Sequence, residues 1–237
     1  MMSGKRWGYV VQFFCLLVFL GMSPFLIKMD GRKTMSVSSD SVRSQNVSDE
    51  VKPVVALTFD DGPNASSTPI LLDGLKERKV RATFFLIGEN VEKDENEKIV
   101  KRMYEEGHLI GNHTYTHCNL SKLETGEAKK EFEQTDTVIE KITGKQPVFV
   151  RAPYGELPVD SEQDLNRIYI GWTVDPLDWM TEDTGAVVKT VVEEINPGDV
   201  ILLHDCYPSS VQAAIRIVDL LQGKGYEFVT VDHLIMD

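Results

Sequence analysis

The chain has 237 residues, of which 42% are hydrophobic and 26% are charged, a composition that is ordinary for a globular protein with one sizeable domain. Its formal net charge of -12 argues against a nucleic-acid-binding protein, because phosphate groups are bound by clustered Lys and Arg. No CxxC pair is present, which excludes a structural zinc finger. If the domain lies outside the cell, Cys118 and Cys206 could form a disulfide, and two unpaired thiols are the alternative.

The first segment of the chain, 1–28, is apolar between basic ends. Two basic residues precede an uncharged stretch from Trp7 to Ile27, and Lys28 closes it. A helix of about 20 apolar residues spans a bilayer, and no Ala-x-Ala cleavage site follows Leu20. We therefore expect one N-terminal transmembrane helix that acts as a signal-anchor, with cleavage of a signal peptide and secretion as the alternative.

A polar, serine-rich segment, 29–50, follows the apolar one. It contains almost no large apolar residues, so we interpret it as a flexible tether. The folded domain is predicted to occupy residues 51–237. Basic residues lie on both sides of the apolar stretch and therefore do not fix its orientation in the membrane.

From residue 53 onward, short apolar runs rich in β-branched and aromatic residues alternate with longer amphipathic segments. The runs predict strands, and the amphipathic segments predict helices. Seven strands are expected at Val54–Phe59, Ala82–Ile87, His108–Gly111, Val148–Arg151, Tyr169–Val174, Val200–Leu203 and Glu227–Val231. Helices are expected at Thr68–Arg78, Glu92–Glu106, Gly126–Ile142, Gly185–Ile195 and Ser209–Gln222. Apolar strands that alternate with helices favour an α/β fold, an incomplete (β/α) barrel of about seven parallel strands.

Ionisable residues follow five of these strands. They are Asp60 and Asp61, His113 and His117, Arg151, Asp175 and Asp178, and His204 and Asp205. Because active sites of parallel barrels assemble at the carboxyl ends of the strands, we expect these side chains to meet at one rim. This placement predicts an enzyme.

Two of these motifs predict a metal site. His113 and His117 are four residues apart, so in a helical turn both rings would lie on one face and reach one ion. Asp60 and Asp61 precede a Gly-Pro turn and offer a third ligand and a separate base. Two histidines and one carboxylate leave coordination positions open, as a catalytic metal centre requires.

Five motifs together resemble a known family. TFDDGP at 58–63, HTYTH at 113–117, RAPYG at 151–155, DPLDW at 175–179 and LLHD at 202–205 are similar to the ordered motifs of the polysaccharide deacetylases, carbohydrate esterase family four. The resemblance extends from about residue 53 to the C-terminus. It implies that 51–237 is a polysaccharide deacetylase catalytic domain with a distorted (β/α) barrel.

The resemblance implies a role for each polar residue at the centre of the site. Asp61, His113 and His117 would hold one divalent metal ion, with zinc or cobalt as the first candidates and manganese or nickel as further ones. Such an ion would bind water and the acetyl carbonyl oxygen, and would lower the pKa of the water to about 7. Asp60 would be the general base, and His204 the general acid that protonates the departing amine.

The remaining motif residues are implied to support that centre. The backbone N–H of Tyr154 would stabilise the tetrahedral oxyanion, and its side chain would pack or contact sugar. Arg151 would orient the base and pair with Asp178. Trp179 and Leu202 would line the pocket for the acetyl methyl group.

Four further residues are interpreted without a catalytic role. We expect Trp172 to fill the barrel and Asp175 to be structural. His108 is expected at a strand edge or in the core, and His233 has no identifiable partner in the sequence.

The family resemblance implies a hydrolase that removes N-acetyl groups from GlcNAc-type residues of an extracellular polysaccharide. Peptidoglycan is the first candidate and a chitin-like glycan the second, because the tether would keep the domain near the membrane, where peptidoglycan is the accessible polymer. One alternative is an O-acetyl esterase acting on xylan or another acetylated glycan. Another is an inactive carbohydrate-binding homologue, against which the complete set of base, acid and metal ligands argues.

Overall fold

The computed structural model describes residues 52–93, 95–157 and 166–236. The predicted anchor, 1–28, and the predicted tether, 29–50, lie outside these residues. Within the described ranges, every helix is too short or too polar to cross a bilayer.

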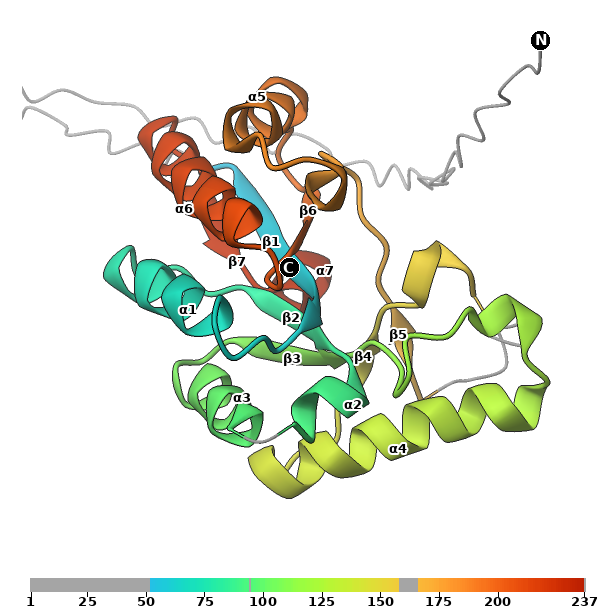
Figure 1. Cartoon of the computed structure of the whole chain (residues 1–237). Coiled ribbons are helices and arrows are strands. Elements are labelled where there is room, and N and C mark those ends of the chain that lie inside the picture. The colour runs from blue at the N-terminus through green and yellow to red at the C-terminus, as the bar shows by residue number, and fades with distance from the viewer. Residues whose placement is uncertain (1–51, 94, 158–165, 237) are drawn as a thin grey trace, which may run out of the picture. The chain divides into compact units, whose positions relative to one another are not determined.

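Parallel strands and outer helices make up the described part of the chain (Figure 1). The strands are β1 Val54–Gly62, β2 Thr83–Leu86, β3 Leu109–Asn112, β4 Phe149–Val150, β5 Ile168–Tyr169, β6 Val200–His204 and β7 Glu227–Val229. The helices are α1 Thr68–Glu77, α2 Gly88–Val91, α3 Asn96–Glu105, α4 Thr125–Thr143, α5 Thr184–Glu194, α6 Pro208–Gly223 and α7 Val231–Met236. Six of the seven predicted strands are confirmed in place, with β4 shorter than expected. Of the strand predicted at Tyr169–Val174, only Tyr169 lies in β5, and the rest belongs to the segment that follows it.

The strands form one curled sheet in the order β5-β4-β3-β2-β1-β6, with β7 paired to the start of β1, and all of these pairs are parallel. After β5 the chain crosses from one end of this sheet to the other. Ile170 N–H donates to Val150 O of β4, whereas Thr173 N–H donates to Val200 O of β6, both at 2.9 Å. The crossing segment spans the gap between the sheet ends, so the predicted incomplete barrel is confirmed.

Successive side chains of β1 point alternately to the hydrophobic core and to the site. Val55, Leu57 and Phe59 are buried in a core shared with the helices. The intervening Thr58 and Asp60 belong to the opposite face, because successive side chains of a strand point to opposite sides, and both accept hydrogen bonds from Arg151. One strand thus supplies apolar residues to the helical layer and polar residues to the barrel interior.

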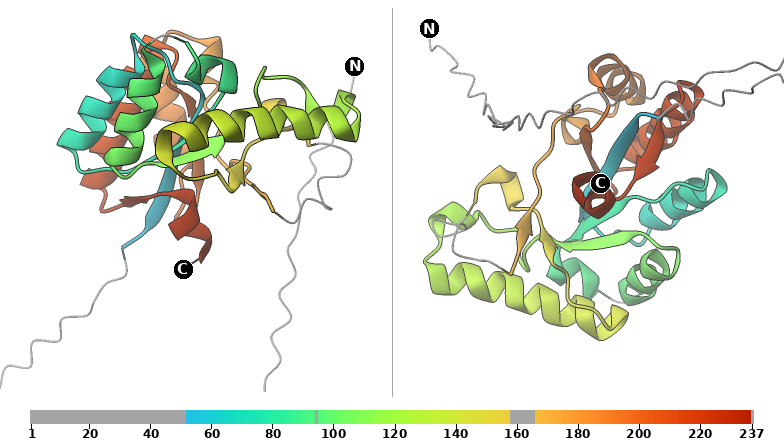
Figure 2. Two further views of the ribbon diagram at one scale, coloured as in Figure 1. Left: turned by 90° about the horizontal axis from the view of Figure 1, so that it is seen from below. Right: turned by 180° about the vertical axis from the view of Figure 1, so that it is seen from behind.

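The helices surround the outer face of the sheet in the order α5, α6, α1, α3 and α4 (Figure 1). Helix α7 packs on β1 at the end of the barrel opposite to α2, which follows the carboxyl end of β2 (Figure 2). The barrel is therefore covered at its sides and at one end, and the carboxyl ends of the strands remain for the site.

Helix α4 confirms its prediction, and α3 corrects one. In α4, Phe132, Thr135 and Ile139 are buried, and Gly144 ends the helix with a φ of 71° that glycine adopts easily. The helix expected at Glu92–Glu106 begins only at Asn96. The Asn96 side chain donates to Asn90 O and Pro63 O, and this tertiary contact turns the chain between α2 and α3.

Candidate metal and catalytic site

Three predicted metal ligands converge at the carboxyl ends of β1 and β3. One ligand atom from each of Asp61, His113 and His117 lies within 4.8 Å of the other two. Asp61 Oδ1 is 3.2 Å from His117 Nε2 and 3.5 Å from His113 Nε2. Burial alone would raise the pKa of Asp61, but His113 and His117 outweigh it and lower that pKa, so the carboxylate stays charged.

The two histidines do not share a helical turn, and that expectation was wrong. Thr114 and His117 have φ values of 66° and 56°, so the left-handed backbone at these positions prevents a helix. Among the described residues, six non-glycine positions have positive φ, and all but Lys79 lie in or next to the motifs that form this site. Such conformations cost of order 1–3 kcal/mol each and persist where the surrounding structure holds them in place.

The donor set fits a divalent cation. His113 Nδ1 lies 2.7 Å from Arg151 O, and donation to this carbonyl leaves the lone pair of Nε2 directed at Asp61. Asp61 Oδ1 is buried and has no hydrogen-bond partner among the described residues. An unpaired buried carboxylate oxygen beside two imidazole nitrogens is the arrangement that a bound ion would stabilise.

The second aspartate of the pair, Asp60, is held by a buried arginine. Arg151 is 1% exposed, and its Nη1 donates to both Asp60 Oδ1 and Thr58 Oγ1 at 2.8 Å. Its remaining N–H groups donate to the carbonyls of Ile170 and Gly171 in the crossing segment. Burial lowers the pKa of Arg151, and the adjacent carboxylate opposes this effect. Arg151 therefore ties the predicted base on β1 to the crossing segment.

The ion pair expected between Arg151 and Asp178 does not form. Both oxygens of Asp178 instead bind His204: Oδ1 lies 2.8 Å from Nδ1, and Oδ2 accepts from the backbone N–H at 2.8 Å. Burial would lower the pKa of His204, but the hydrogen bond and the charge of Asp178 raise it to about 9. His204 is accordingly protonated at neutral pH, as a general acid must be.

A single cavity of about 430 Å³ collects the predicted residues, with Asp60, Asp61, His113, His117, Tyr154, Trp179, Leu202 and His204 in its wall. Arg151 and Asp178 lie behind this wall and hold the residues in it. The expectation that five strands deliver their ionisable residues to one rim is confirmed.

A model of the polysaccharide deacetylase family matches residues 48–170 of the sequence. The chain belongs to the polysaccharide deacetylase family. The match includes the two motifs that contain the predicted metal ligands and the one that contains Arg151.

Known polysaccharide deacetylases are similar over most of the described domain. A peptidoglycan-N-acetylglucosamine deacetylase of Bacillus cereus is 42% identical over 190 residues, which are 77% of this chain and 68% of that protein. The peptidoglycan-N-acetylmuramic acid deacetylase PdaC of Bacillus subtilis is 39% identical over 82% of this chain, which spans only 41% of PdaC.

Solved structures share the fold. The PdaC structure has a TM-score of 0.74, at 39% identity, and covers 78% of this chain and 90% of the solved one. A family 4 acetyl xylan esterase of Clostridium thermocellum, solved with a cobalt ion, has a TM-score of 0.72 at 33% identity. The similarity covers 76% of this chain and 89% of the solved one.

Other residues of this deacetylase site were missed from the sequence. Trp172 and Asp175 line the cavity, so the interpretation of Trp172 as barrel filling was incomplete. Asp175 also accepts a hydrogen bond from the backbone of Leu177, which is the structural role expected of it. Tyr207 lines the cavity with its ring 6.2 Å from that of His204, and only its position shortly after the LLHD motif could have indicated this.

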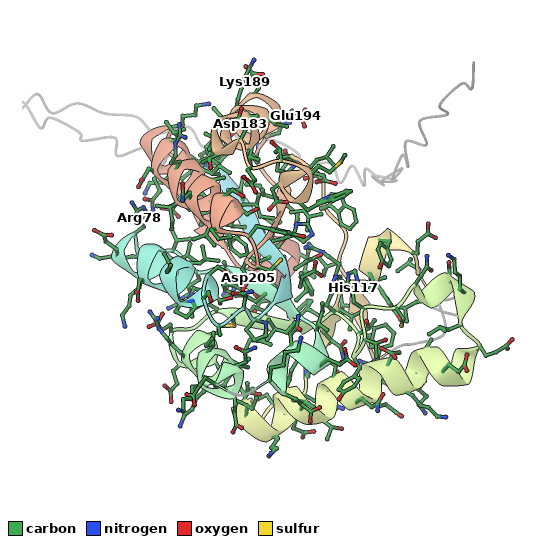
Figure 3. The ribbon with its side chains drawn as sticks, viewed as in Figure 1. Arg78, His117, Asp183, Lys189, Glu194 and Asp205 are labelled. Carbon is green, nitrogen blue, oxygen red and sulfur yellow. The ribbon has the colours of Figure 1, made fainter. Side chains whose placement is uncertain are left out.

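Buried Asp205 supports the start of α1, just after the loop that follows Asp61. Its Oδ2 accepts from Thr68 Oγ1 at 2.5 Å, and its backbone carbonyl accepts from Ser67 Oγ at 2.5 Å. A Cβ added to Gly62 would lie only 2.5 Å from Asp205 Oδ1, so this position needs glycine. Burial raises the pKa of Asp205 to about 7. In Figure 3, Asp205 and His117 lie among the strands, unlike Lys189 and Glu194 on the outer helix α5.

The remaining predictions on single residues have mixed outcomes. Cys118 and Cys206 are both free, so the thiol alternative holds in this structure. His108 is buried, accepts from Ala82 N–H and packs edge-on against Phe84, which confirms a place in the core. His233 does have a partner: its Nδ1 lies 2.9 Å from Thr230 Oγ1. Both residues are far in sequence from the motifs that form the site.

The contact between Asp178 and His204 predicts a pH effect. In Asp178→Asn the negative charge is lost, and the pKa of His204 should fall from about 9 toward or below its ordinary value of 6.5. Because the acid must be protonated to act, the basic limb of the pH profile of kcat/KM should move to lower pH. Activity at pH 8 should therefore fall more than activity at pH 6. A profile that keeps its basic limb in place would contradict this role; Asp183→Asn, on the exposed N-terminus of α5, is the control.

Proposed function

We propose that this protein is a metal-dependent hydrolase that removes N-acetyl groups from peptidoglycan, with GlcNAc residues as its first substrate. The observation that carries the proposal is the content of one cavity: a donor set for a divalent ion, a carboxylate fixed by a buried arginine, and a protonated imidazole. The names of the relatives from Bacillus support peptidoglycan as the polymer.

Different residues of the chain carry out the separate steps of the hydrolysis. Asp60 is oriented by Arg151 and takes a proton from the attacking water, whose oxygen forms a bond with the acetyl carbon. A divalent ion held by Asp61, His113 and His117 would supply a Lewis acid for the carbonyl and would lower the pKa of water to about 7.

His204 completes the reaction on the amine. Its Nδ1 donates to Asp178, so its Nε2–H is the proton that remains for the substrate. When the carbon–nitrogen bond breaks, this proton passes to the nitrogen, and the products are acetate and a free amine. Leu202 is 4% exposed in the cavity wall and lines the space for the methyl group of the acetyl group. Trp179 lines the same cavity.

Acetate release from a panel of polymers tests the proposal. The protein is expected to release acetate from peptidoglycan faster than from chitin oligomers or acetylated xylan, and digestion products should carry the new amine on GlcNAc. If the new amines are found on MurNAc alone, MurNAc replaces GlcNAc as the proposed substrate sugar. If the protein releases acetate from none of the N-acetylated glycans, the proposed function is refuted.

An O-acetyl esterase is the second candidate, because the acetyl xylan esterase of Clostridium thermocellum has the same fold at 33% identity. The same residues would hydrolyse an ester, since the attack on the acetyl carbon is unchanged. Faster acetate release from acetylated xylan than from peptidoglycan would favour this candidate.

We also propose that the apolar segment 1–28 anchors the catalytic domain outside the cell membrane as a single-pass protein. The uncharged stretch between Trp7 and Ile27 supports this proposal, and so does a substrate that lies outside the membrane. The chain should sediment with membranes, and protease added outside the cell should remove the domain. Recovery of a shortened chain in the medium would instead indicate cleavage and secretion.

A further inference from the structure

The loop 114–117 carries one of the predicted metal ligands and belongs to no helix or strand. At its tip, the backbone N–H groups of Tyr115 and Thr116 both donate to Glu131 Oε2 of α4, at 2.9 and 2.8 Å. The Thr116 hydroxyl donates to Glu131 Oε1 at 3.0 Å. We propose that Glu131 is a positioning residue that holds this loop in the conformation that binds a divalent ion. The inference rests on the proposed function, because that function places the ion at this site.

The backbone of this loop requires support from its surroundings. Thr114 and His117 have φ values of 66° and 56°, and such left-handed conformations persist only where the surrounding structure holds them. The carbonyls of Thr114 and Tyr115 accept from the backbone N–H groups of Gly88 and Glu89 in α2, both at 3.0 Å. Helix α2 thus fixes the carbonyl groups of the loop, and the carboxylate on α4 fixes its N–H groups. The two helices also pack against each other (Figure 1).

Helix α4 is connected to the other predicted histidine ligand as well. Asn112 is the last residue of β3 and the chain neighbour of His113, and it is completely buried. Its Nδ2 donates to Asp136 Oδ1 at 2.6 Å and to Phe132 O at 2.9 Å, both in α4. Asp136 is buried too and forms an ion pair with Arg167 at 2.7 Å. Both histidines are therefore held from one helix, one of them through the end of β3 and the other through the loop.

Loss of the Glu131 carboxylate would release the tip of the loop. The two backbone N–H groups would then bind water, and binding of the ion would have to order the loop, which weakens binding. Substitution of groups that orient metal ligands typically weakens metal binding by about 10–100-fold. The side chain of Glu131 is only partly buried, so its removal should affect the metal site far more than the fold.

Cobalt binding tests the inference without hydrolysis. The full chain is freed of metal, and Co²⁺ is added while the visible absorption of the bound ion, which depends on the geometry of its ligands, is recorded. Glu131→Leu accepts no hydrogen bond and should bind Co²⁺ at least about tenfold more weakly, equivalent to about 1.4 kcal/mol, with an altered spectrum. Glu131→Gln should bind within about threefold of the unchanged protein, because its amide oxygen can still accept from both N–H groups.

The contact can also be removed from the loop side. Thr116→Val, at an exposed position, deletes the hydroxyl that donates to Glu131. It should weaken Co²⁺ binding in the unchanged protein and have no further effect in Glu131→Leu, because both substitutions remove the same interaction. Equal losses in the two backgrounds would contradict the proposed contact. Thermal unfolding of the metal-free proteins should be similar, which separates loss of the site from loss of the fold.

The matched control is Glu140→Leu, an exposed glutamate of the same helix, which should leave Co²⁺ affinity and spectrum unchanged. Unchanged affinity in Glu131→Leu would overturn the inference. An equal loss in Glu131→Gln would overturn it too, because the carboxylate would then act through its charge. If the affinities change as expected while no N-acetylated glycan yields acetate, the positioning role stands and the proposed function fails. If the unchanged protein binds no Co²⁺, both are refuted.

Discussion

Loss of the divalent ion is expected to abolish acetate release, and His117→Ala should lower kcat/KM by at least about 10³-fold. Lewis-acid catalysis contributes several kcal/mol to the stabilisation of the transition state, and each 1.36 kcal/mol corresponds to a factor of ten. His117 is the better choice than His113, because its side chain is 27% exposed against 2% and its removal leaves a smaller void. Activity on peptidoglycan should return when zinc or cobalt is added to the chelated protein.

A histidine far from the site provides the control for this change. His233→Ala removes an imidazole whose side chain is 60% exposed at the C-terminal helix, and it should leave both metal content and activity unchanged. Metal content of the purified variants, measured by elemental analysis, separates loss of the ion from unfolding. Full activity after thorough chelation would show that the three ligands serve another purpose.

Asp60→Asn is expected to reduce kcat by about 10²–10⁴-fold, the usual contribution of a general base. The amide oxygen can still accept from Arg151, but the buried guanidinium loses its opposite charge. Breaking a buried pair in this way commonly costs about 3–5 kcal/mol, so the free energy of unfolding should fall as well. Steady-state acetate release and denaturant unfolding measure the two effects separately.

An aspartate in an ion pair on the surface serves as the reference for Asp60→Asn. Asp73 binds Arg102 through an exposed side chain, and Asp73→Asn should change stability by no more than about 1 kcal/mol and leave kcat alone. An Asp60→Asn protein that is folded, retains its metal and remains fully active would exclude Asp60 as the base.

The fold was predictable because each strand carries its own signal. In β1, a run of β-branched and apolar residues ends at Asp60 and Asp61, and the same change from apolar to polar marks the end of β6 at His204. These local patterns place polar residues at the carboxyl ends of parallel strands, where barrels form their sites. Most of the ionisable residues of the cavity could therefore be named without coordinates.

Contacts between distant segments were not predictable in the same way. The partner of Asp178 depends on how a turn after β5 approaches β6, and the sequence contains nothing that prefers Arg151 or His204 for it. The left-handed backbone at Thr114 and His117 is equally hidden, since neither residue type signals positive φ. Trp172 and Tyr207 are apolar enough to suit a core, and only the tertiary structure exposes them to the cavity.

The position of β1 in the sheet has a consequence for how the enzyme is made. β1 pairs with β2, which is synthesised next, but also with β6 and β7 near the end of the chain. A nascent chain thus carries all three proposed metal ligands by residue 117 and lacks the proposed acid, His204, until most of the polypeptide has been synthesised. Until then one edge of β1 has no partner, an exposure that favours association with other chains. Any truncation before β6 should accordingly aggregate rather than yield a smaller enzyme.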